Sequence, residues 1–420
     1  MIYIERELEK KIRKLMDAPE IIAVLGARQV GKTTLMKRIF DTIDDTKIFL
    51  DFEDPEIVGL FDEDIKTFAK LYVENHNFVF LDEFQYSKNG GKNLKYLYDT
   101  YKKKFLVSGS SSLELTVKLP AFLVGRIFIL ELFPFTLKEF FAFRAPEEFE
   151  ISKEKALRME PVPSFVHEKL LKLLEEFVIY GGFPRVVTAM ETDEKKLVLK
   201  NLITTYLLKD IRGFFRLSSE YPFNRFMKAL SLQIGNLLNY SELSNITGIS
   251  LREVKKYLSI LEETYIIKLS KPFYRNKRTE IVKNPKVYFL DNGLRNATIN
   301  DFRDPSERVD TGQLLENLIA SELVKYGLEL RFWRTKGGAE IDFVIEKNGK
   351  LIPVEVKSSI RSTPGKSLVS FAQKYKCDFA FIFYKGNLKT FTKINTKFIF
   401  LPIYLISVFK EMIENKHVAF

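Results

Sequence analysis

The sequence has one cysteine, Cys377, and three histidines among its 420 residues. A single cysteine excludes an internal disulfide framework and a zinc site built from cysteine thiolates. The histidines lie far apart in the sequence, so they form no metal-binding motif. Hydrophobic residues make up 46% and charged residues 29%, which is typical of a globular protein with apolar cores.

A long hydrophobic run is also missing. The longest run, 398–409, spans about 12 residues, fewer than the roughly 18 that a membrane-crossing helix needs. Pro402 interrupts it, which favours a buried strand followed by a turn. The first residues, 1–7, carry too many charges for a secretory signal peptide. We therefore expect a cytoplasmic protein that makes no membrane contact. Its net charge of +11 is compatible with a nucleic-acid partner.

The most informative segment that is present reads GARQVGKTT, at 26–34, and it fits the phosphate-binding pattern G-x-x-x-x-G-K-[ST]. Residues 21–25 predict a short buried strand before it, and residues 34–40 predict a helix after it. The backbone N–H groups of such a loop, with the positive end of the helix, face nucleotide phosphates. The sequence therefore predicts an ATP site formed by Gly26, Ala27, Arg28, Gln29, Val30, Gly31, Lys32, Thr33 and Thr34.

Two side chains of this loop have expected roles in catalysis. Lys32 would reach the β and γ phosphates, and the Thr33 hydroxyl would coordinate Mg²⁺. A hydrophobic strand at 79–81 ends in two carboxylates. Asp82 would help to hold the Mg²⁺, and Glu83 would polarise the attacking water. A kinase would not need this second acid, so the pair predicts ATP hydrolysis.

Two further polar residues follow predicted strands. Ser110 comes after a strand at 104–107, where it would sense the γ-phosphate and position the water. Arg126 precedes a strand at 127–130. It would act as an arginine finger, on the γ-phosphate of a neighbouring subunit or of its own, or it would be a surface arginine in a structural salt bridge. Action on a neighbouring subunit would make the protein a homo-oligomer.

Together these motifs resemble the AAA+ ATPases, and more narrowly a prokaryotic, archaeal-type branch of that family. The segments that carry the resemblance are 26–34, 81–85, 108–112, 125–126, 132–140 and 180–185. The resemblance implies an α/β protein: a P-loop AAA+ core with a parallel sheet, a helical lid, and a C-terminal domain of unassigned function with a PD-(D/E)XK nuclease-like core. AAA+ proteins are often rings, so the resemblance also allows a homo-oligomer.

We expect four domains: the AAA+ core at 1–145, the helical lid at 146–225, a winged helix at 226–300 and the nuclease-like domain at 305–420. Residues 146–163 are charged and rich in proline, so they predict a linker or a solvated helix. Residues 167–179 have helical spacing and predict a lid helix. Arg185 follows this helix, and it would either contact the nucleotide from the lid or lie on the surface.

The winged helix is predicted from residues 240–263. A helix and a glycine turn lead to Ser250, which forms a capping box with Glu253 at the start of a second helix, 251–263. Its inward face has Val254, Leu258 and Leu261, and its outward face has Arg252, Lys255 and Lys256. Strands at 265–269 and 286–290 would flank a basic wing, 274–278. This pattern suits DNA, although winged helices also serve as protein contacts.

The C-terminal region predicts a metal site. A strand at 338–345, a turn at Asn348-Gly349 and a strand at 351–359 would place Asp342 across a hairpin from Glu355. Asp342 and Glu355 would ligate Mg²⁺ or Mn²⁺. Glu316 would add a ligand or orient a water from a preceding helix, and Lys357 would hold or activate the attacking water. This pattern resembles the PD-(D/E)XK nucleases, although the Pro-Asp pair is not literally present. A Glu-x-Lys pair is also common as a simple ion pair.

These features favour an ATP-binding and ATP-hydrolysing AAA+ switch that acts on DNA through a winged helix and a nuclease-like domain. Two alternatives remain open at this point. One is a Mg²⁺-dependent DNA endonuclease regulated by ATP. The other is a nucleotide-gated interaction module whose nuclease fold is inactive.

Overall fold

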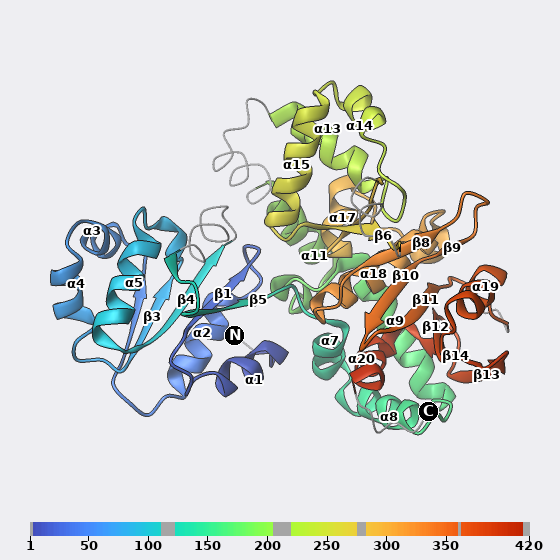
Figure 1. Cartoon of the computed structure of the whole chain (residues 1–420), viewed down its shortest axis with the longest axis horizontal. Coiled ribbons are helices and arrows are strands. Elements are labelled where there is room, and N and C mark those ends of the chain that lie inside the picture. The colour runs from blue at the N-terminus through green and yellow to red at the C-terminus, as the bar shows by residue number, and fades with distance from the viewer. Residues whose placement is uncertain (1–2, 111–121, 205–219, 275–282, 360–362, 415–420) are drawn as a thin grey trace. The chain divides into compact units, whose positions relative to one another are not determined.

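The computed structural model describes residues 3–110, 122–204, 220–274, 283–359 and 363–414 (Figure 1). The chain divides into two compact units. The first comprises Met1–Phe133 with Ser259–Ile266, and the second comprises Pro134–Leu258 with Ile267–Phe420. Across the described ranges, no helix combines the length and the apolar character needed to cross a membrane.

The first unit contains a five-stranded parallel sheet with the order β2-β3-β4-β1-β5. Its strands are β1 (Ile21–Gly26), β2 (Lys47–Asp51), β3 (Phe78–Asp82), β4 (Lys104–Ser110) and β5 (Ile127–Glu131). All positions of β1 and β4 are buried, as expected for central parallel strands covered on both faces. The predicted α/β core with a parallel sheet is therefore confirmed.

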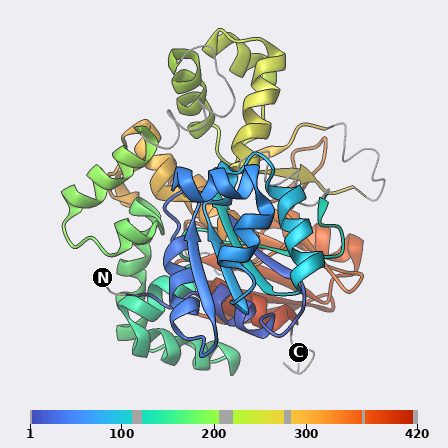
Figure 2. The ribbon, with the colours of Figure 1, turned by 90° about the vertical axis from the view of Figure 1, so that its left-hand side faces the viewer.

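Helices cover this sheet, as Figure 2 shows with the first unit towards the viewer. They are α1 (Glu7–Lys14), α2 (Lys32–Asp41), α3 (Pro55–Glu63), α4 (Ile65–Tyr72) and α5 (Gly90–Tyr101). The register pairs Gly26 with Ser110, and Leu81 with Val107. The ends of β1, β3 and β4 therefore meet at the carboxyl edge of the sheet, where ligands of open α/β sheets bind.

The second unit begins with helices. They are α7 (Leu137–Arg144), α8 (Pro146–Leu157), α9 (Ser164–Tyr180), α10 (Pro184–Val187) and α11 (Thr192–Asn201). The helix predicted at 167–179 is present as α9, which buries Leu170, Leu174 and Phe177 on one face. The prediction of a linker or solvated helix at 146–163 was wrong in part, because α8 buries Phe149 and Ala156. Their spacing of seven residues places both on one face of the helix.

Three helices and a hairpin follow along the chain: α13 (Glu220–Ser231), α14 (Tyr240–Thr247), α15 (Leu251–Glu263), β6 (Ile267–Pro272) and β7 (Lys286–Phe289). The last residues of α15, from Ser259, are counted with the first unit. The capping box at the start of α15 is confirmed, since the Glu253 N–H donates to the Ser250 Oγ and the Ser250 N–H donates to the Glu253 carboxylate. Val254, Leu258 and Leu261 are buried as predicted. β7 leads into α17 (Asn292–Ile299).

β6 is also part of a larger sheet. The order of this sheet is β7-β6-β8-β9, with β8 (Arg331–Arg334) parallel to β6 and β9 (Glu340–Ile341) antiparallel to β8. A second sheet has the order β10-β11-β12-β14-β13. Its strands are β10 (Phe343–Lys347), β11 (Lys350–Val356), β12 (Phe379–Tyr384), β13 (Lys389–Lys393) and β14 (Thr396–Pro402).

Helices α18 (Thr311–Lys325), α19 (Lys366–Tyr375) and α20 (Ile406–Glu414) complete this region. The single strand predicted at 338–345 was wrong: it divides at Asp342 into β9 and β10, which belong to different sheets. The turn at Asn348-Gly349 is confirmed, with positive φ at both residues. The apolar run 398–409 forms the predicted buried strand and turn, and then enters α20.

Candidate functional site

The phosphate-binding loop joins β1 to α2 through backbone conformations that its glycines make possible. Gly31 has φ of 95°, in the left-handed region, and Gln29 has φ of 60°. A Cβ atom on Gly26 would lie 2.1 Å from the carbonyl oxygen of Leu132, so no other residue fits there without a shift of the backbone. α2 begins at Lys32, and its N-terminal N–H groups and the positive end of its dipole therefore lie at the loop.

The Lys32 side chain is buried against this loop. Its ammonium donates to the carbonyl oxygens of Gly26 at 3.2 Å and Ala27 at 2.9 Å. Burial lowers the pKa of Lys32 to about 8, and the negative charges of Glu83 and Asp82 oppose that shift. An ammonium has three N–H donors, so two carbonyl contacts leave capacity for a phosphate oxygen.

Asp82 and Glu83 lie at the end of β3, where a serine of β4 connects them. The Ser108 hydroxyl donates to the Asp82 carboxylate and accepts the Glu83 N–H at 3.3 Å. Glu83 has φ of 51°, so the chain turns sharply directly after Asp82. The Asp82 carboxylate is therefore held in place by a short hydrogen bond inside the sheet, while the Glu83 side chain is directed separately.

Gln85 links Glu83 to Ser110. The Gln85 amide donates to the Glu83 carboxylate, and the Ser110 N–H donates to the Gln85 Oε1 at 3.1 Å. Gln85 belongs to the short helix η1 (Phe84–Tyr86). The structure thus brings Ser110 into the network through its main chain. The hydroxyl in contact with Asp82 is that of Ser108, a residue that the sequence analysis did not single out.

Two arginines, Arg6 and Arg28, make further contacts at the phosphate-binding loop. Arg6 is buried, and it donates to the carbonyl oxygens of Val30 at 2.9 Å and Phe133 at 2.6 Å. Arg28, within the loop, lies 3.4 Å from the Tyr86 hydroxyl. The sequence analysis did not single out Arg6, because the oxygens it contacts here belong to backbone carbonyls, which leave no pattern in the sequence.

The residues at this edge fit a nucleotide with Mg²⁺. Thr33 lies in the first turn of α2 and is partly exposed, while Asp82 supplies a fixed carboxylate. A hydroxyl and a carboxylate are hard oxygen ligands of the kind that Mg²⁺ prefers. Thr34, the last residue of the motif, is exposed on α2.

Arg126 and Arg185 have acidic partners in the structure. Arg126 pairs with Asp99 at 2.8 Å, directly before β5. Ile127 is opposite Ile21, the first residue of β1, so Arg126 lies at the amino edge of the sheet, about 16 Å of strand away from Gly26. Arg185, in α10 of the second unit, pairs with Glu194 and is more than half exposed.

The carboxylates of the C-terminal region surround a lysine. The Lys286 ammonium lies 3.1 Å from the Glu316 Oε1 and 2.5 Å from the Glu340 Oε1. The Tyr288 hydroxyl donates to the same Glu316 oxygen at 2.6 Å. Burial by itself would lower the pKa of Lys286, but the neighbouring carboxylates, Glu316 foremost, outweigh it and raise the pKa. We call Lys286, Glu316, Glu340 and Asp342 the lysine–carboxylate cluster.

Asp342, between β9 and β10, accepts the Val356 N–H at 2.7 Å. Burial and the charge of Glu316 raise the pKa of Asp342 to about 8, against the charge of Lys286. Glu355 pairs instead with Lys357, with 2.5 Å between the Oε1 and the Nζ. The other Glu355 oxygen is buried and has no hydrogen-bond partner in the described ranges.

The structure brings the predicted metal ligands Glu316 and Glu355 near enough to Asp342 for their charges to act on it, but the three carboxylates bond different partners. Within the described ranges, no three histidine, cysteine or acidic side chains are grouped so as to hold a metal ion. An ammonium already contacts Glu316 and Glu340 at hydrogen-bond distance. As arranged, these side chains do not fit a divalent ion.

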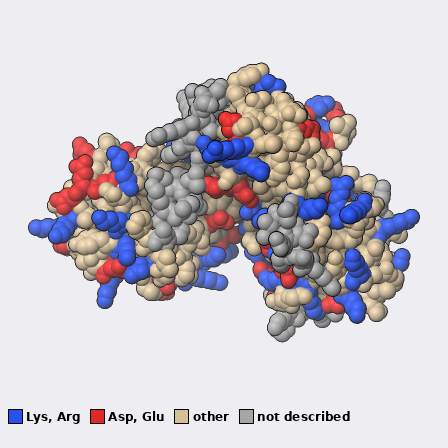
Figure 3. All heavy atoms as spheres, turned by 45° about the horizontal axis from the view of Figure 1, so that its top comes forward, with Lys and Arg blue, Asp and Glu red and all other residues tan. Residues whose placement is uncertain are grey.

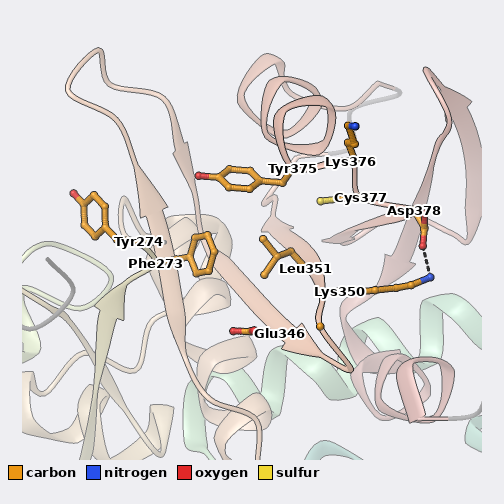
Figure 4. A pocket seen from close by; sticks show the side chains of 10 residues that line it. Phe273, Tyr274, Glu346, Lys350, Leu351, Tyr375, Lys376, Cys377 and Asp378 are labelled. Atoms are coloured by element: carbon orange, nitrogen blue, oxygen red, sulfur yellow. Dashed lines mark hydrogen bonds and ion pairs between the residues drawn. The ribbon is translucent and has the colours of Figure 1, made fainter. Parts of the chain in front are cut away.

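A cavity of about 530 Å³ opens elsewhere in the second unit, beside the β10–β11 turn (Figure 4). The apolar part of its lining comes from Phe273, Leu351 and Tyr375. The Lys350 ammonium, also in the lining of the cavity, donates to the Asp378 carboxylate at 2.6 Å. Burial raises the pKa of the lining Cys377 to about 12, which makes its thiol unreactive. None of the site residues predicted from the sequence lines this cavity.

Comparison with family models divides the chain into three. Residues 18–141 match an AAA domain, and residues 171–304 and 311–406 match two domains of unknown function, DUF8612 and DUF4143. The chain thus carries an AAA domain, which indicates ATPase activity and binding of ATP with Mg²⁺, followed by further domains with mixed sheets.

Relatives extend this similarity along the chain. An uncharacterized protein of Methanocaldococcus jannaschii is 27% identical over 84% of this chain and 77% of its own length. One of Haemophilus influenzae is 25% identical over 86% and 88%. Among solved structures, the Aeropyrum pernix ORC1 protein in complex with DNA is 14% identical, covering 71% of this chain and 93% of that one, with a TM-score of 0.29. The Thermotoga maritima RuvB Holliday junction branch migration motor is 16% identical, covering 63% and 89%, with the same TM-score.

Proposed function

We propose that this protein is an AAA+ ATPase whose nucleotide cycle changes how its second unit engages DNA. The observation that carries the proposal is the arrangement at the carboxyl edge of the parallel sheet. Among the described residues, a buried lysine uses two of its three N–H donors on loop carbonyls, and the charge of a strand-end carboxylate that a serine holds in place acts on it. Bound Mg²⁺ would supply the positive charge that neutralises the phosphates.

The chain's own residues divide the work of hydrolysis. The loop N–H groups and Lys32 bind and orient the phosphates, and Thr33 and Asp82 hold oxygen positions for the metal. Glu83 accepts the proton of the attacking water, and the Gln85 amide orients its carboxylate. Ser110 fixes Gln85 through its backbone N–H.

For Arg126 to contact a phosphate, that phosphate must belong to a neighbouring subunit. Its place at the amino edge of the sheet is too far along β1 from its own phosphate loop. We therefore propose that Arg126 completes the site of an adjacent copy in an ATP-bound homo-oligomer. Sedimentation of the protein with ATP tests this, and a monomer under all nucleotide conditions would leave Arg126 as the structural partner of Asp99.

The second unit supplies the proposed DNA contacts. We assign α9, α10 and α11 to a helical lid, and α13, α14, α15 and the β6–β7 hairpin to a winged helix. Arg252, Lys255 and Lys256 are exposed on α15, opposite its buried face. The predicted basic wing residues Arg275, Lys277 and Arg278 lie outside the described residues. Lys and Arg side chains are interleaved with Asp and Glu over the face shown in Figure 3, so we assign DNA contact to α15 rather than to a broad basic surface.

The sheet β10–β14 with α18 and α19 would be the PD-(D/E)XK-like domain. Between the two alternatives for this domain, the lysine–carboxylate cluster favours an interaction module over a Mg²⁺-dependent endonuclease. A plasmid nicking assay with Mg²⁺ or Mn²⁺ tests this choice, and cleavage that Asp342→Ala removes would restore the endonuclease.

The proposal as a whole is tested with Glu83→Gln, which we expect to bind ATP but to turn it over about 100-fold more slowly. DNA affinity is then measured by fluorescence anisotropy with ATP and with ADP. A change between the two nucleotides, and loss of affinity in the Arg252→Gln/Lys255→Gln/Lys256→Gln variant, are expected. Equal DNA affinity in both nucleotide states would show that ATP does not control DNA binding.

A further inference from the structure

Lys286 sits where a carboxylate site of this kind would bind its cation. Its side chain is 3% exposed and is enclosed by acids from two separate elements, Glu316 of α18 and Glu340 of β9. The distances to their oxygens are 3.1 and 2.5 Å, and Asp342 adds a further negative charge when it is ionised. A divalent ion binds carboxylate oxygens at about 2.0–2.6 Å, so the same oxygens cannot hold both cations at once.

β7, which carries this lysine, is fixed to α18 by further hydrogen bonds. The Asn317 amide accepts the Phe289 N–H at 2.7 Å and donates to the Phe289 carbonyl at 2.9 Å. The Ser321 hydroxyl donates to the Leu290 carbonyl at 2.7 Å. These contacts lie along α18 just beyond Glu316. They fix the position of β7, and β7 in turn keeps the Lys286 ammonium beside the carboxylates.

We propose that Lys286 is the resident cation of the lysine–carboxylate cluster, and that its ammonium keeps a divalent metal out of the C-terminal domain. The partly buried carboxylates of Glu316, Glu340 and Asp342 would repel one another without a cation, which is costly where water is partly excluded. The ammonium supplies the missing charge from within the chain. When it is removed, the carboxylates form an oxygen-rich site with unbalanced negative charge, the chemistry that Mn²⁺, Mg²⁺ and Ca²⁺ bind.

This inference is independent of the proposed ATPase, because it concerns only residues of the second unit and needs no nucleotide. It also explains how α18 and the β6–β7 hairpin are joined. The ion pair of Lys286 with Glu316 joins β7, a strand of the proposed winged helix, to α18, the first helix of the proposed nuclease-like domain.

The test compares the full-length chain with its Lys286→Met variant, in the absence of nucleotide and with MnCl₂ as the probe. Methionine keeps the length of the side chain and removes its charge. We expect Lys286→Met to unfold at a lower temperature than the wild type and MnCl₂ to restore part of that loss. Electron paramagnetic resonance should detect one more bound Mn²⁺ per chain in the variant.

Two matched variants make the test specific. Lys283→Met removes an exposed lysine three positions earlier on the approach to β7, and it should leave both the unfolding temperature and Mn²⁺ binding unchanged. Adding Glu316→Gln to Lys286→Met should abolish the gained Mn²⁺ binding. The proposal is overturned if the wild type binds Mn²⁺ as the variant does and Glu316→Gln removes it, or if folded Lys286→Met gains no Mn²⁺ binding.

A charge-balanced double variant covers the case in which Lys286→Met does not fold. Lys286→Met/Glu316→Gln lacks one positive and one negative charge, so we expect it to be more stable than Lys286→Met alone. If the two substitutions instead destabilise additively, Lys286 does not neutralise Glu316 and the inference fails.

Discussion

Lys32 and Lys286 are both buried, yet their ammonium groups have opposite surroundings. Lys32 contacts two neutral carbonyls, and burial lowers its pKa to about 8. Lys286 contacts two carboxylates, which raise its pKa. Within the described part of the chain, the first cation contacts no carboxylate and the second contacts two. Lys32 is therefore suited to bind an incoming anion, whereas the charge of Lys286 is already balanced by carboxylates of the fold.

Lys104 shows that a lowered pKa alone does not identify a binding lysine. Its ammonium also lies among carbonyls, and burial lowers its pKa to about 8. It donates, however, to three of them, those of Leu15, Ala18 and Glu20, at 2.7–2.8 Å. All three N–H donors are therefore engaged. Lys32 differs in donating to two carbonyls beside a glycine-rich loop and a helix N-terminus.

The largest expected effect is the loss of ATP binding in Lys32→Ala. Removing the ammonium takes away a charged contact to the phosphates, so affinity should fall about 100-fold, equivalent to about 3 kcal/mol. Isothermal titration with a slowly hydrolysed ATP analogue measures it. Lys37→Ala, at an exposed position of the same helix, is the control and should bind normally. Unchanged affinity in Lys32→Ala would rule out the phosphate-loop assignment.

The second effect is on stability, and it should separate the two lysines. Lys286→Met leaves the partly buried carboxylates of Glu316 and Glu340 without their cation, so the free energy of unfolding should drop by about 3 kcal/mol, the lower end of the range for a buried ion pair. Lys32→Met removes a buried charge that has only carbonyl partners, so its loss should stay below about 1 kcal/mol. Urea unfolding followed by circular dichroism, without nucleotide or metal, compares the two. Equal losses would mean that the carboxylates do not set Lys286 apart.

The smallest effect distinguishes the two serines of β4. Ser108→Ala removes the hydroxyl that holds Asp82, so the rate of ATP turnover should fall about tenfold, which corresponds to about 1.4 kcal/mol. Ser110→Ala keeps the backbone N–H that bonds Gln85, so turnover should stay close to that of the wild type. Steady-state phosphate release measures both. The reverse order would favour the role predicted for the Ser110 hydroxyl from the sequence.

The parts of the structure that sequence predicts well are local ones. The strand, loop and helix at 21–40 and the capping box of Ser250 with Glu253 depend on residues a few positions apart, and both are present. Comparison with known families supports the AAA domain at 18–141. In these segments the backbone conformation and the side-chain chemistry follow from the same short pattern.

Contacts between distant segments could not be predicted in the same way. Ser108 meets Asp82 only because β4 inserts between β1 and β3. Lys286 was predicted only as the first residue of a strand at 286–290, and nothing in its neighbourhood in the sequence indicates Glu316 or Glu340. The break at Asp342 depends on two sheets diverging there, which the alternation of residues in one strand does not reveal.

The pairing of β6 on both of its edges has a mechanical consequence. A hairpin that protrudes alone can swing about its base, but β6 bonds β7 on one side and β8 on the other. A force applied to the hairpin by a bound polymer would therefore pass through hydrogen bonds into the β8–β9 segment. We therefore expect the β6–β7 hairpin and the β8–β9 segment to move together when a force is applied to the hairpin.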